Sequence, residues 1–294
     1  MSNLQLRWYH RLYVGVQYAL PQHLLSAQMY RLTRLRWRPI KDLIIRLFVR
    51  HFRVDMGEAL EPDATAFATF NHFFTRELRP GARPLAPEPD ALLCPADGAL
   101  SQLGRIEDGR IFQAKGRDYS LLELLGGDLD RAARLAGGQF ATIYLSPRDY
   151  HRVHMPRAGI LREMVHVPGR LFSVNPVTTS LVPRLFARNE RVVCLFEGDA
   201  GPMALTLVGA FFVGSMETVW AGQVTPTRGA SPSRRYDGEP AIRLDRGEEM
   251  GRFNMGSTVI LICPPDAVEW DQTLKPGDSL RMGQRLGRVR MPRE

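Results

Sequence analysis

The first fifty residues mix basic and apolar positions at helical spacing. Apolar side chains recur every three or four residues over residues 4–18 and 24–35, and a third apolar series covers residues 40–49. Pro21 and Pro39 separate the three series, because proline breaks a helix interior. The pattern predicts three short amphipathic helices. None has the roughly 18 uninterrupted apolar residues of a membrane-spanning helix, and we expect no signal peptide.

The rest of the chain has a different pattern. Around residues 54–85 the composition changes to that of a linker, within which residues 67–78 predict a helix with an aromatic face. Beyond them, short apolar runs separated by Gly, Pro and Asp predict strands over residues 91–94, 110–114, 139–145, 159–167, 191–196, 203–213, 218–221, 258–263 and 284–289. Short helices are predicted over residues 120–126 and 129–135. This pattern predicts an α+β fold: a mainly antiparallel β barrel- or sandwich-like body with a few helices, preceded by N-terminal amphipathic helices.

Charge is concentrated at one end of this 294-residue chain. Residues 1–53 hold ten Lys/Arg and one acid, a net charge of +9, so the remaining residues sum to −1. We therefore divide the chain into a basic segment, residues 1–57, and a body, residues 58–294. Basic residues mixed with Trp8 and Trp37 are typical of helices at an anionic membrane surface, although a solvated face packing on the body remains the alternative. A body without a basic face argues against nucleic acid.

Cysteine and histidine spacing gives no indication of a metal site. Cys94, Cys194 and Cys263 are isolated in apolar runs, which predicts reduced core thiols in a cytosolic protein. His151 and His154 are three residues apart, but no cysteine or further acid at ligand spacing completes a site. We expect no metal.

Three places carry groups suited to catalysis. Asp97 lies in a tight turn after an apolar run, His154 follows the apolar run 139–145, and Ser257 precedes the β-branched run 258–263. Each has an ordinary structural explanation by itself. Together they supply the orienter, base and nucleophile of a catalytic relay. The serine lacks the Gly-x-Ser-x-Gly elbow of hydrolases, so its nearest electrophile is its own peptide bond with Gly256.

These motifs resemble the bacterial phosphatidylserine decarboxylases, which are pyruvoyl-dependent, membrane-associated enzymes. The likeness covers nearly the whole chain, over residues 73–80, 95–98, 144–156, 171–176, 189–191, 208–210, 213–216, 249–251 and 256–258. The pairing of the block 144–156 with a downstream Gly-Ser-Thr is the most specific part. Met255 is one departure, because the family usually has Leu there, and the two side chains are similar in volume.

The resemblance implies a proenzyme that cleaves itself between Gly256 and Ser257, giving a beta chain of residues 1–256 and an alpha chain of residues 257–294. His154, oriented by Asp97, would take the proton of Ser257, whose oxygen attacks the Gly256 carbonyl. Asp149 would assist. Ser257 would end as a pyruvoyl group, without metal or pyridoxal phosphate.

The resemblance also implies the later chemistry. The pyruvoyl group would form a Schiff base with phosphatidylserine and accept electrons as carbon dioxide leaves. His151 would then donate the proton that gives phosphatidylethanolamine, and Phe172 and Asn175 would line the pocket. The enzyme would be peripheral on the cytoplasmic side of the cell membrane, with phosphatidylserine and the anionic surface as partners. It would be a heterodimer of the two chains, with higher homo-oligomers left open.

Two other functions are compatible with parts of the sequence. A pyruvoyl enzyme could instead decarboxylate a soluble amino acid, although the basic N-terminal segment argues against this. Residues 275–287 resemble the pattern of turn and strand residues in lipoyl and biotinyl carriers, so the body could be a non-catalytic barrel-sandwich module. Such a module would not need His151, His154 or the Gly-Ser bond.

Overall fold

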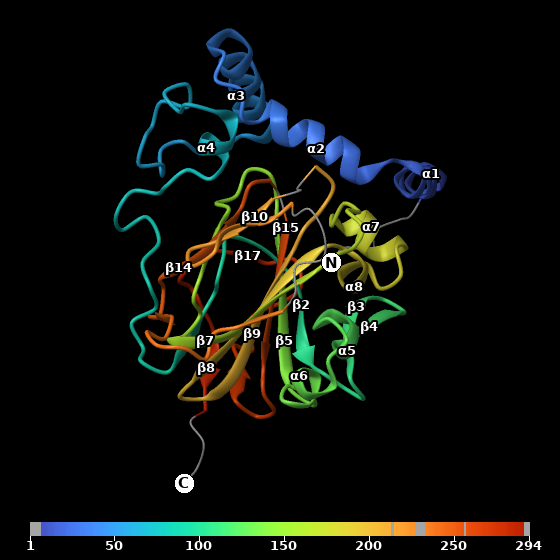
Figure 1. Cartoon of the computed structure of the whole chain (residues 1–294), viewed down its shortest axis with the longest axis vertical. Helices are drawn as coiled ribbons and strands as arrows, with labels where there is room; N and C mark the ends of the chain where they lie inside the picture. Colours follow the sequence, from blue (N-terminus) through green and yellow to red (C-terminus); the bar gives the residue numbers. More distant parts are fainter. Residues whose placement is uncertain (1–6, 213–214, 227–232, 256, 291–294) are drawn as a thin grey trace.

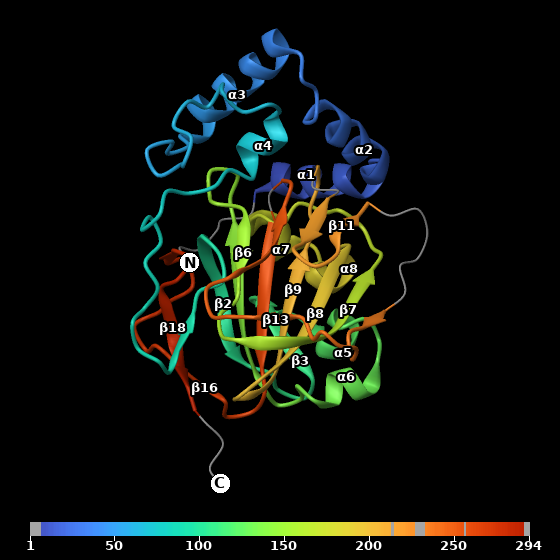
Figure 2. The same cartoon turned by 60° about the vertical axis from the view of Figure 1, so that its left-hand side comes forward.

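The computed structural model describes residues 7–212, 215–226, 233–255 and 257–290. Its first three elements are the helices α1 (Trp8–Ala19), α2 (Gln22–Leu32) and α3 (Arg38–Phe52), which confirm the three predicted helices. Pro39 lies in the first turn of α3, where its missing N–H would have no helical partner in any case. The three helices lie together over one end of the β-rich body (Figures 1 and 2). No helix in the described ranges is long and apolar enough to cross a bilayer.

The body is organised around one large antiparallel sheet. Its strand order is β12–β7–β8–β9–β15–β5–β2–β17, and β13 also pairs with β7. The bounds are β2 (Gly98–Arg105), β5 (Gln139–Leu145), β7 (Gly159–Val167), β8 (Arg191–Gly198), β9 (Gly201–Val208), β12 (Arg234–Arg235), β13 (Arg243–Leu244), β15 (Ser257–Cys263) and β17 (Ser279–Leu280). We call this the main sheet.

Smaller elements cover the main sheet. A three-stranded sheet has the order β1 (Ala91–Leu93), β18 (Arg285–Val289), β16 (Val268–Trp270), and a four-stranded sheet has the order β11 (Gly222–Thr225), β10 (Met216–Thr218), β14 (Glu249–Phe253), β6 (Arg152–His154). A hairpin joins β3 (Arg110–Ala114) and β4 (Arg117–Ser120), and the short helices are α4 (Phe70–Phe74), α5 (Leu121–Leu124), α6 (Leu129–Ala133), α7 (Pro176–Leu181) and α8 (Leu185–Arg188). The described sheets are open, so the α+β class is confirmed without a closed barrel.

The central strands of the main sheet are buried on both faces. On β15, Val259 and Leu261 belong to one hydrophobic core and Ile260 and Ile262 to another, as side-chain alternation requires. The first core includes residues of the three- and four-stranded sheets, and the second includes residues of α5, α8 and the β3–β4 hairpin. Ser257 has the same parity as Val259. Its side chain therefore lies on the face that the four-stranded sheet covers.

A third core joins the N-terminal helices to the body. Ile45 and Phe48 of α3 pack with Phe73 and Phe74 of α4. Lys41 of α3 is buried, and its Nζ donates 2.7 Å hydrogen bonds to the carbonyl oxygens of Thr65 and Phe67. The segment interpreted as a linker is thus bound to α3 through its backbone.

Some predicted boundaries are wrong. The helix predicted over residues 67–78 is limited to α4, which begins after the Thr69 cap. The strand predicted over residues 218–221 ends at Thr218, where a turn begins. The predicted strand 203–213 ends at Val208, and residue 213 lies outside the described ranges. The three cysteines are buried and free.

Candidate active site

Ser257 is the first residue of β15 and pairs with Leu145 of β5. Its side chain is fully buried, and its Oγ has no hydrogen-bond partner in the described part of the chain. Gly256, and with it the Gly256–Ser257 bond, lies outside the described residues. An unpaired buried hydroxyl is unfavourable by about 1–3 kcal/mol, so this hydroxyl is free of hydrogen bonds that would have to break before it reacts.

The chain just before this bond is fixed by buried amides. Asn254 Nδ2 donates to Ser215 Oγ at 2.7 Å and to Glu217 Oε1 at 2.8 Å. Asn254 Oδ1 accepts a hydrogen bond from Asn71 Nδ2 of α4 at 3.0 Å. These contacts position the backbone two residues before Gly256. The sequence interpretation did not assign a role to either asparagine, because the pairing between them depends on tertiary structure.

His154 is held at both of its ring nitrogens. Its Nδ1 lies 2.8 Å from the Gly247 carbonyl oxygen and its Nε2 lies 3.1 Å from the Tyr150 hydroxyl. A carbonyl oxygen can only accept, so in the neutral imidazole Nδ1 carries the proton and Nε2 presents the lone pair. Burial lowers the pKa of His154, which keeps the ring neutral near pH 7.

Asp97 is held by an arginine rather than by His154. Arg83 Nε and Nη2 donate to the two carboxylate oxygens of Asp97 at 2.9 and 2.5 Å, and the Met282 N–H adds a bond of 2.8 Å. No hydrogen bond joins the side chains of Asp97, His154 and Ser257 among the described residues. The guanidinium fork matches a carboxylate better than one imidazole N–H does, so Gly247 orients the histidine instead.

Strand pairing nevertheless brings the segments that contain Asp97, Ser257 and His154 together at one end of the main sheet. Tyr144 of β5 pairs with Ala99 of β2 on one side and with Thr258 of β15 on the other. The His154 backbone N–H donates to the Pro95 carbonyl at 2.8 Å. Asp97, Ser257 and His154 are therefore each within two residues of these pairing points.

His151 is fully buried and stacks on Phe74 of α4, with ring centroids 4.0 Å apart and an interplanar angle of 21°. Neither ring nitrogen makes a hydrogen bond of normal geometry with a described residue. Burial and the positive charge of Arg76 lower the pKa of His151 to about 3, so the free ring is neutral. The Phe253 N–H donates to the His151 carbonyl at 3.0 Å, which joins this residue to the segment that leads to Ser257.

The three remaining predicted site residues, Asp149, Asn175 and Phe172, make different kinds of contact. Asp149 accepts from the Ser146 N–H and hydroxyl at 2.7 and 2.8 Å, and burial raises its pKa. Asn175 caps α7 through a 3.1 Å bond from the Thr178 N–H and also lines a cavity described below. Phe172 is buried against Tyr18, with ring centroids 4.8 Å apart, and is a packing residue in this structure.

Two apolar cavities lie between the helices and the body. The larger, of about 310 Å³, is lined by Phe48, Phe52, Phe74, Tyr144, Leu145, Pro147, Ser173, Val174, Asn175, Ala210, Phe211, Phe212 and Met255. The smaller, of about 200 Å³, is lined by Met29, Leu32, Thr33, Ile44, Phe48, Phe70 and Met255. Phe48 and Met255 line both cavities, so both border Met255, the residue that precedes Gly256.

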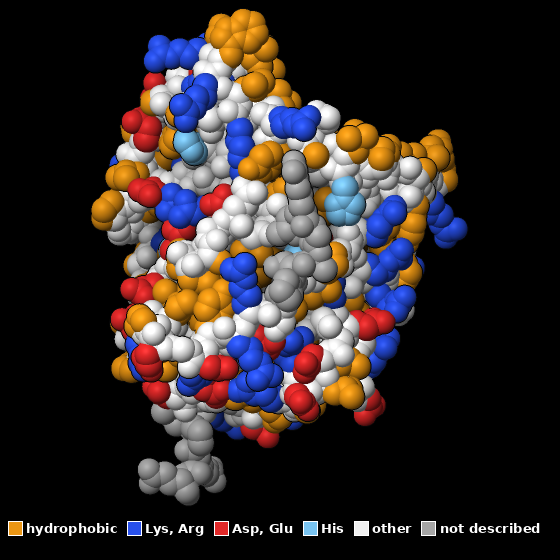
Figure 3. All heavy atoms as spheres, viewed as in Figure 1, with side chains coloured by type: hydrophobic (Ala, Val, Ile, Leu, Met, Phe, Trp, Pro, Cys, Tyr) orange, Lys and Arg blue, Asp and Glu red, His pale blue; other side chains and the backbone are white. Residues whose placement is uncertain are grey.

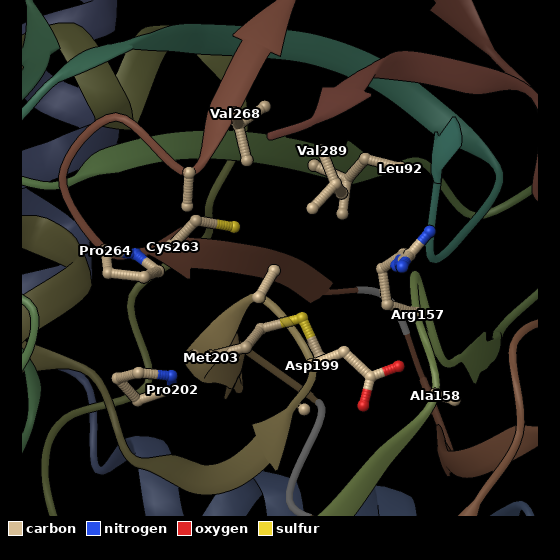
Figure 4. A pocket seen from close by; sticks show the side chains of 14 residues that line it. Leu92, Arg157, Ala158, Asp199, Pro202, Met203, Cys263, Pro264, Val268 and Val289 are labelled. Carbon is tan, nitrogen blue, oxygen red and sulfur yellow. The ribbon is translucent and has the colours of Figure 1, made fainter. Parts of the chain in front are cut away.

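A separate crevice of about 30 Å³ lies at the far end of β15. Cys263, Met203 and Val268 are among the mainly apolar side chains around it, and Arg157 and Asp199 are its charged residues (Figure 4). Cys263 lies six positions after Ser257, about 20 Å along β15. The crevice is therefore remote from the candidate site.

Comparison with known proteins identifies the family. A family model described as phosphatidylserine decarboxylase matches residues 70–288, and a second one, described as PSD, matches residues 12–53. The chain is 59% identical over 278 residues to the phosphatidylserine decarboxylase proenzyme of Bordetella pertussis, with 94% of each chain covered. It is 58% identical over 281 residues to the protein of that name from Azotobacter vinelandii, covering 95% of this chain and 98% of the relative. The chain belongs to the phosphatidylserine decarboxylase family.

The match to this decarboxylase family includes every candidate site segment. Residues 70–288 contain α4, Asp97, the loop before β6 and the start of β15. The shorter match covers most of α1 and all of α2 and α3. The chain is 58–59% identical to decarboxylase proenzymes over nearly its whole length, which favours an enzyme over the carrier-like module.

Proposed function

We propose that this chain is a self-processing phosphatidylserine decarboxylase. The family match carries this proposal, together with the buried, unpartnered Ser257 hydroxyl at the start of β15. The direct test compares carbon dioxide release from phosphatidylserine in detergent micelles with release from free serine. Release from the lipid alone supports the proposal, whereas release from serine alone would favour the soluble amino acid substrate.

Self-cleavage starts from groups already described. His154 Nε2 takes the Ser257 proton, and Oγ attacks the Gly256 carbonyl carbon to replace the amide with an ester. Elimination across the Ser257 Cα–Cβ bond releases residues 1–256 as a carboxylate, and hydrolysis of the resulting enamine releases ammonia. Asp97 acts on His154 by charge, and Asp149 assists within the same loop.

The product of this cleavage is a pyruvoyl group at residue 257. Its ketone supplies an electron sink for decarboxylation. The buried position of Ser257, paired with Leu145 that lines the larger apolar cavity, suits a group that must be shielded from water. We assign His151 as the proton donor to the reacting carbon; because the free ring is neutral, it first takes up a proton when the bound anionic substrate raises its pKa.

The pH dependence of cleavage follows from the state of His154. Only the neutral imidazole can accept the Ser257 proton, and burial lowers the pKa of His154 below its ordinary value of 6.5. We expect a cleavage rate constant that is flat from pH 8 to pH 7 and falls at a midpoint below pH 6.5. Freshly synthesised precursor, moved to buffers of different pH and sampled by gel electrophoresis, provides the measurement. A midpoint at or above pH 7 would contradict the assignment.

The N-terminal helices have one face for the body and one for a membrane. Ser173 N–H donates to Gln17 at 2.8 Å and Leu171 N–H to Gln22 at 2.8 Å, which fixes α1 and α2 to the body. Exposed large apolar residues lie on these helices and on the turn between α2 and α3: Trp8, Tyr9, Leu12, Val16, Leu24, Leu35, Trp37, Leu43 and Leu47. Figure 3 shows hydrophobic side chains along the edge that these helices form. We infer that this edge binds the anionic membrane from the cytoplasmic side and admits the lipid to the apolar cavities.

Membrane binding can be tested without removing the helices, whose deletion would also expose the body. The variant Trp37→Ser/Leu43→Ser/Leu47→Ser loses three side chains that are each more than half exposed. We expect about tenfold or greater loss of affinity for phosphatidylglycerol–phosphatidylcholine vesicles, because apolar insertion contributes most of such binding. Flotation with the vesicles gives the bound fraction. The matched control is Phe112→Ser/Leu129→Ser/Val219→Ser, on exposed positions of the body. Equal loss in both variants would contradict the proposed surface.

A further inference from the structure

Arg76, just beyond α4, is a buried charge that the steps above do not use. Only 4% of it is exposed, and burial lowers its pKa. Its Nη2 donates to the Arg148 carbonyl at 3.2 Å, and its guanidinium lies 5.7 Å from the Phe73 ring centroid. Its Nε has no hydrogen-bond partner, and no carboxylate forms an ion pair with it in the described ranges. A buried, unpaired guanidinium is unfavourable unless a ligand completes it.

Arg76 lines a polar cavity of about 250 Å³, which we call the arginine cavity. The other lining residues are Arg53, Asp55, Glu58, Leu78, Arg83, Asp97, Arg148, Asp149, Tyr150, Ser279, Leu280 and Arg281. Most of the carboxylates are already engaged. Arg83 binds Asp97 and Glu58, Arg281 binds Glu58 at 3.0 Å, and the Asp55 carboxylate accepts from the Gly57 N–H. Arg76 is nearly fully buried and forms no ion pair with these carboxylates in the described ranges.

The arginine cavity adjoins the groups that react. Asp97, Asp149 and Tyr150 line it, and Tyr150 is the residue that binds His154 Nε2. Phe74, two residues before Arg76, stacks on His151. The positive charge of Arg76 helps to lower the pKa of His151. An anion bound at Arg76 is therefore beside the reaction centre.

We propose that Arg76 binds the phosphodiester of the phosphatidylserine headgroup and gives the site its preference for phosphate-bearing substrates. This inference rests on the proposed function. Phosphatidylserine carries two anionic groups, the phosphodiester and the serine carboxylate. An arginine paired with the carboxylate would stabilise the ground state, because that charge leaves the carboxylate during decarboxylation. The phosphodiester keeps its charge throughout, so its pairing with Arg76 holds the substrate without opposing the reaction. The planar guanidinium fork also suits phosphate oxygens.

The test uses the self-cleaved enzyme and two ligands that are soluble as monomers. Dihexanoyl phosphatidylserine contains the phosphodiester, and O-octylserine has the amine and carboxylate without phosphate. We expect Arg76→Met to raise the KM for the phospholipid about tenfold or more and to leave the inhibition constant of O-octylserine within about twofold. The control Arg290→Met removes an exposed charge outside the arginine cavity, where it pairs with Glu269, and is expected to change neither constant more than about twofold.

Each other outcome has a defined meaning. An unchanged KM, or equal losses for both ligands, would overturn the proposal, since a purely structural arginine or a carboxylate partner predicts that pattern. Loss of inhibition by inorganic phosphate with an unchanged lipid KM would assign Arg76 to free phosphate and also overturn it.

If Arg76→Met fails to self-cleave, Arg76→Lys decides, with a phospholipid-specific rise in KM of about threefold or more expected. If the wild-type enzyme has no activity, the proposed function fails. Calorimetric binding of dihexanoyl phosphatidylethanolamine to wild type and variant then decides the role of Arg76.

Discussion

Replacing Ser257 with Ala is expected to leave one uncleaved chain of 294 residues without decarboxylase activity. The substitution removes the only atom that can attack the Gly256 carbonyl in the proposed mechanism, so no ester and no ketone can form. The expected loss is complete for cleavage, and activity falls to background. Gel electrophoresis and carbon dioxide release measure the two effects. Because the Oγ has no hydrogen-bond partner among the residues that the structure describes, the fold itself is expected to tolerate the change.

A matched control lies on the neighbouring strand. Thr206 of β9 pairs with Ile260 of β15, is fully buried, and likewise has an unpartnered hydroxyl. Thr206→Val removes that hydroxyl while keeping the side-chain shape, and normal cleavage and activity are expected. Cleavage of the Ser257→Ala chain between residues 256 and 257 would contradict the account.

Substitution of His154 is expected to impair self-cleavage, and substitution of His151 is expected to impair decarboxylation. His154→Gln should remain uncleaved or cleave at least about 100-fold more slowly, because general base catalysis typically contributes factors of this size. His151→Gln should cleave, since its ring makes no normal hydrogen bond to the cleavage groups, yet decarboxylate at least about 100-fold more slowly. Cleavage time courses and turnover of the processed protein are the measurements.

A comparison variant checks that the effect of His154 arises from its basic nitrogen. Tyr150→Phe removes the hydroxyl partner of Nε2 but leaves the Gly247 contact with Nδ1. It is expected to slow cleavage by less than about tenfold. A cleaved His154→Gln protein together with an intact His151→Gln protein would reverse the two assignments.

Periodicity and motif spacing were sufficient for much of the fold. The predicted strands over residues 110–114, 139–145 and 159–167 match β3, β5 and β7, because each is an apolar run bounded by turn residues. Strand β2 was missed since Gly98, at its start, reads as a turn residue. Gly98 is required there by close packing, as an added Cβ would lie 2.3 Å from the Tyr144 carbonyl oxygen. Local patterns do not report such tertiary contacts.

The site could be predicted only in its reactive residues. Ser257, His154 and Asp97 were found because hydroxyl, imidazole and carboxylate groups near strand ends suggest chemistry, and the family resemblance gave their roles. Their partners were not found. Arg83 belongs to an irregular segment, and Gly247 acts through its backbone oxygen, which no side-chain pattern reveals. Arg76 lies in a recognised motif, but its lack of an ion pair is visible only in three dimensions.

The central claim is that the chain cuts itself at Ser257 and forms a ketone there. An intact-mass spectrum of the purified protein, recorded with and without a carbonyl reagent, tests it most directly. We expect two fragments, residues 1–256 and residues 257–294, with the shorter one gaining the mass of one reagent molecule. A single folded chain of 294 residues that gains no mass would contradict the account, because it would have no electron sink for decarboxylation.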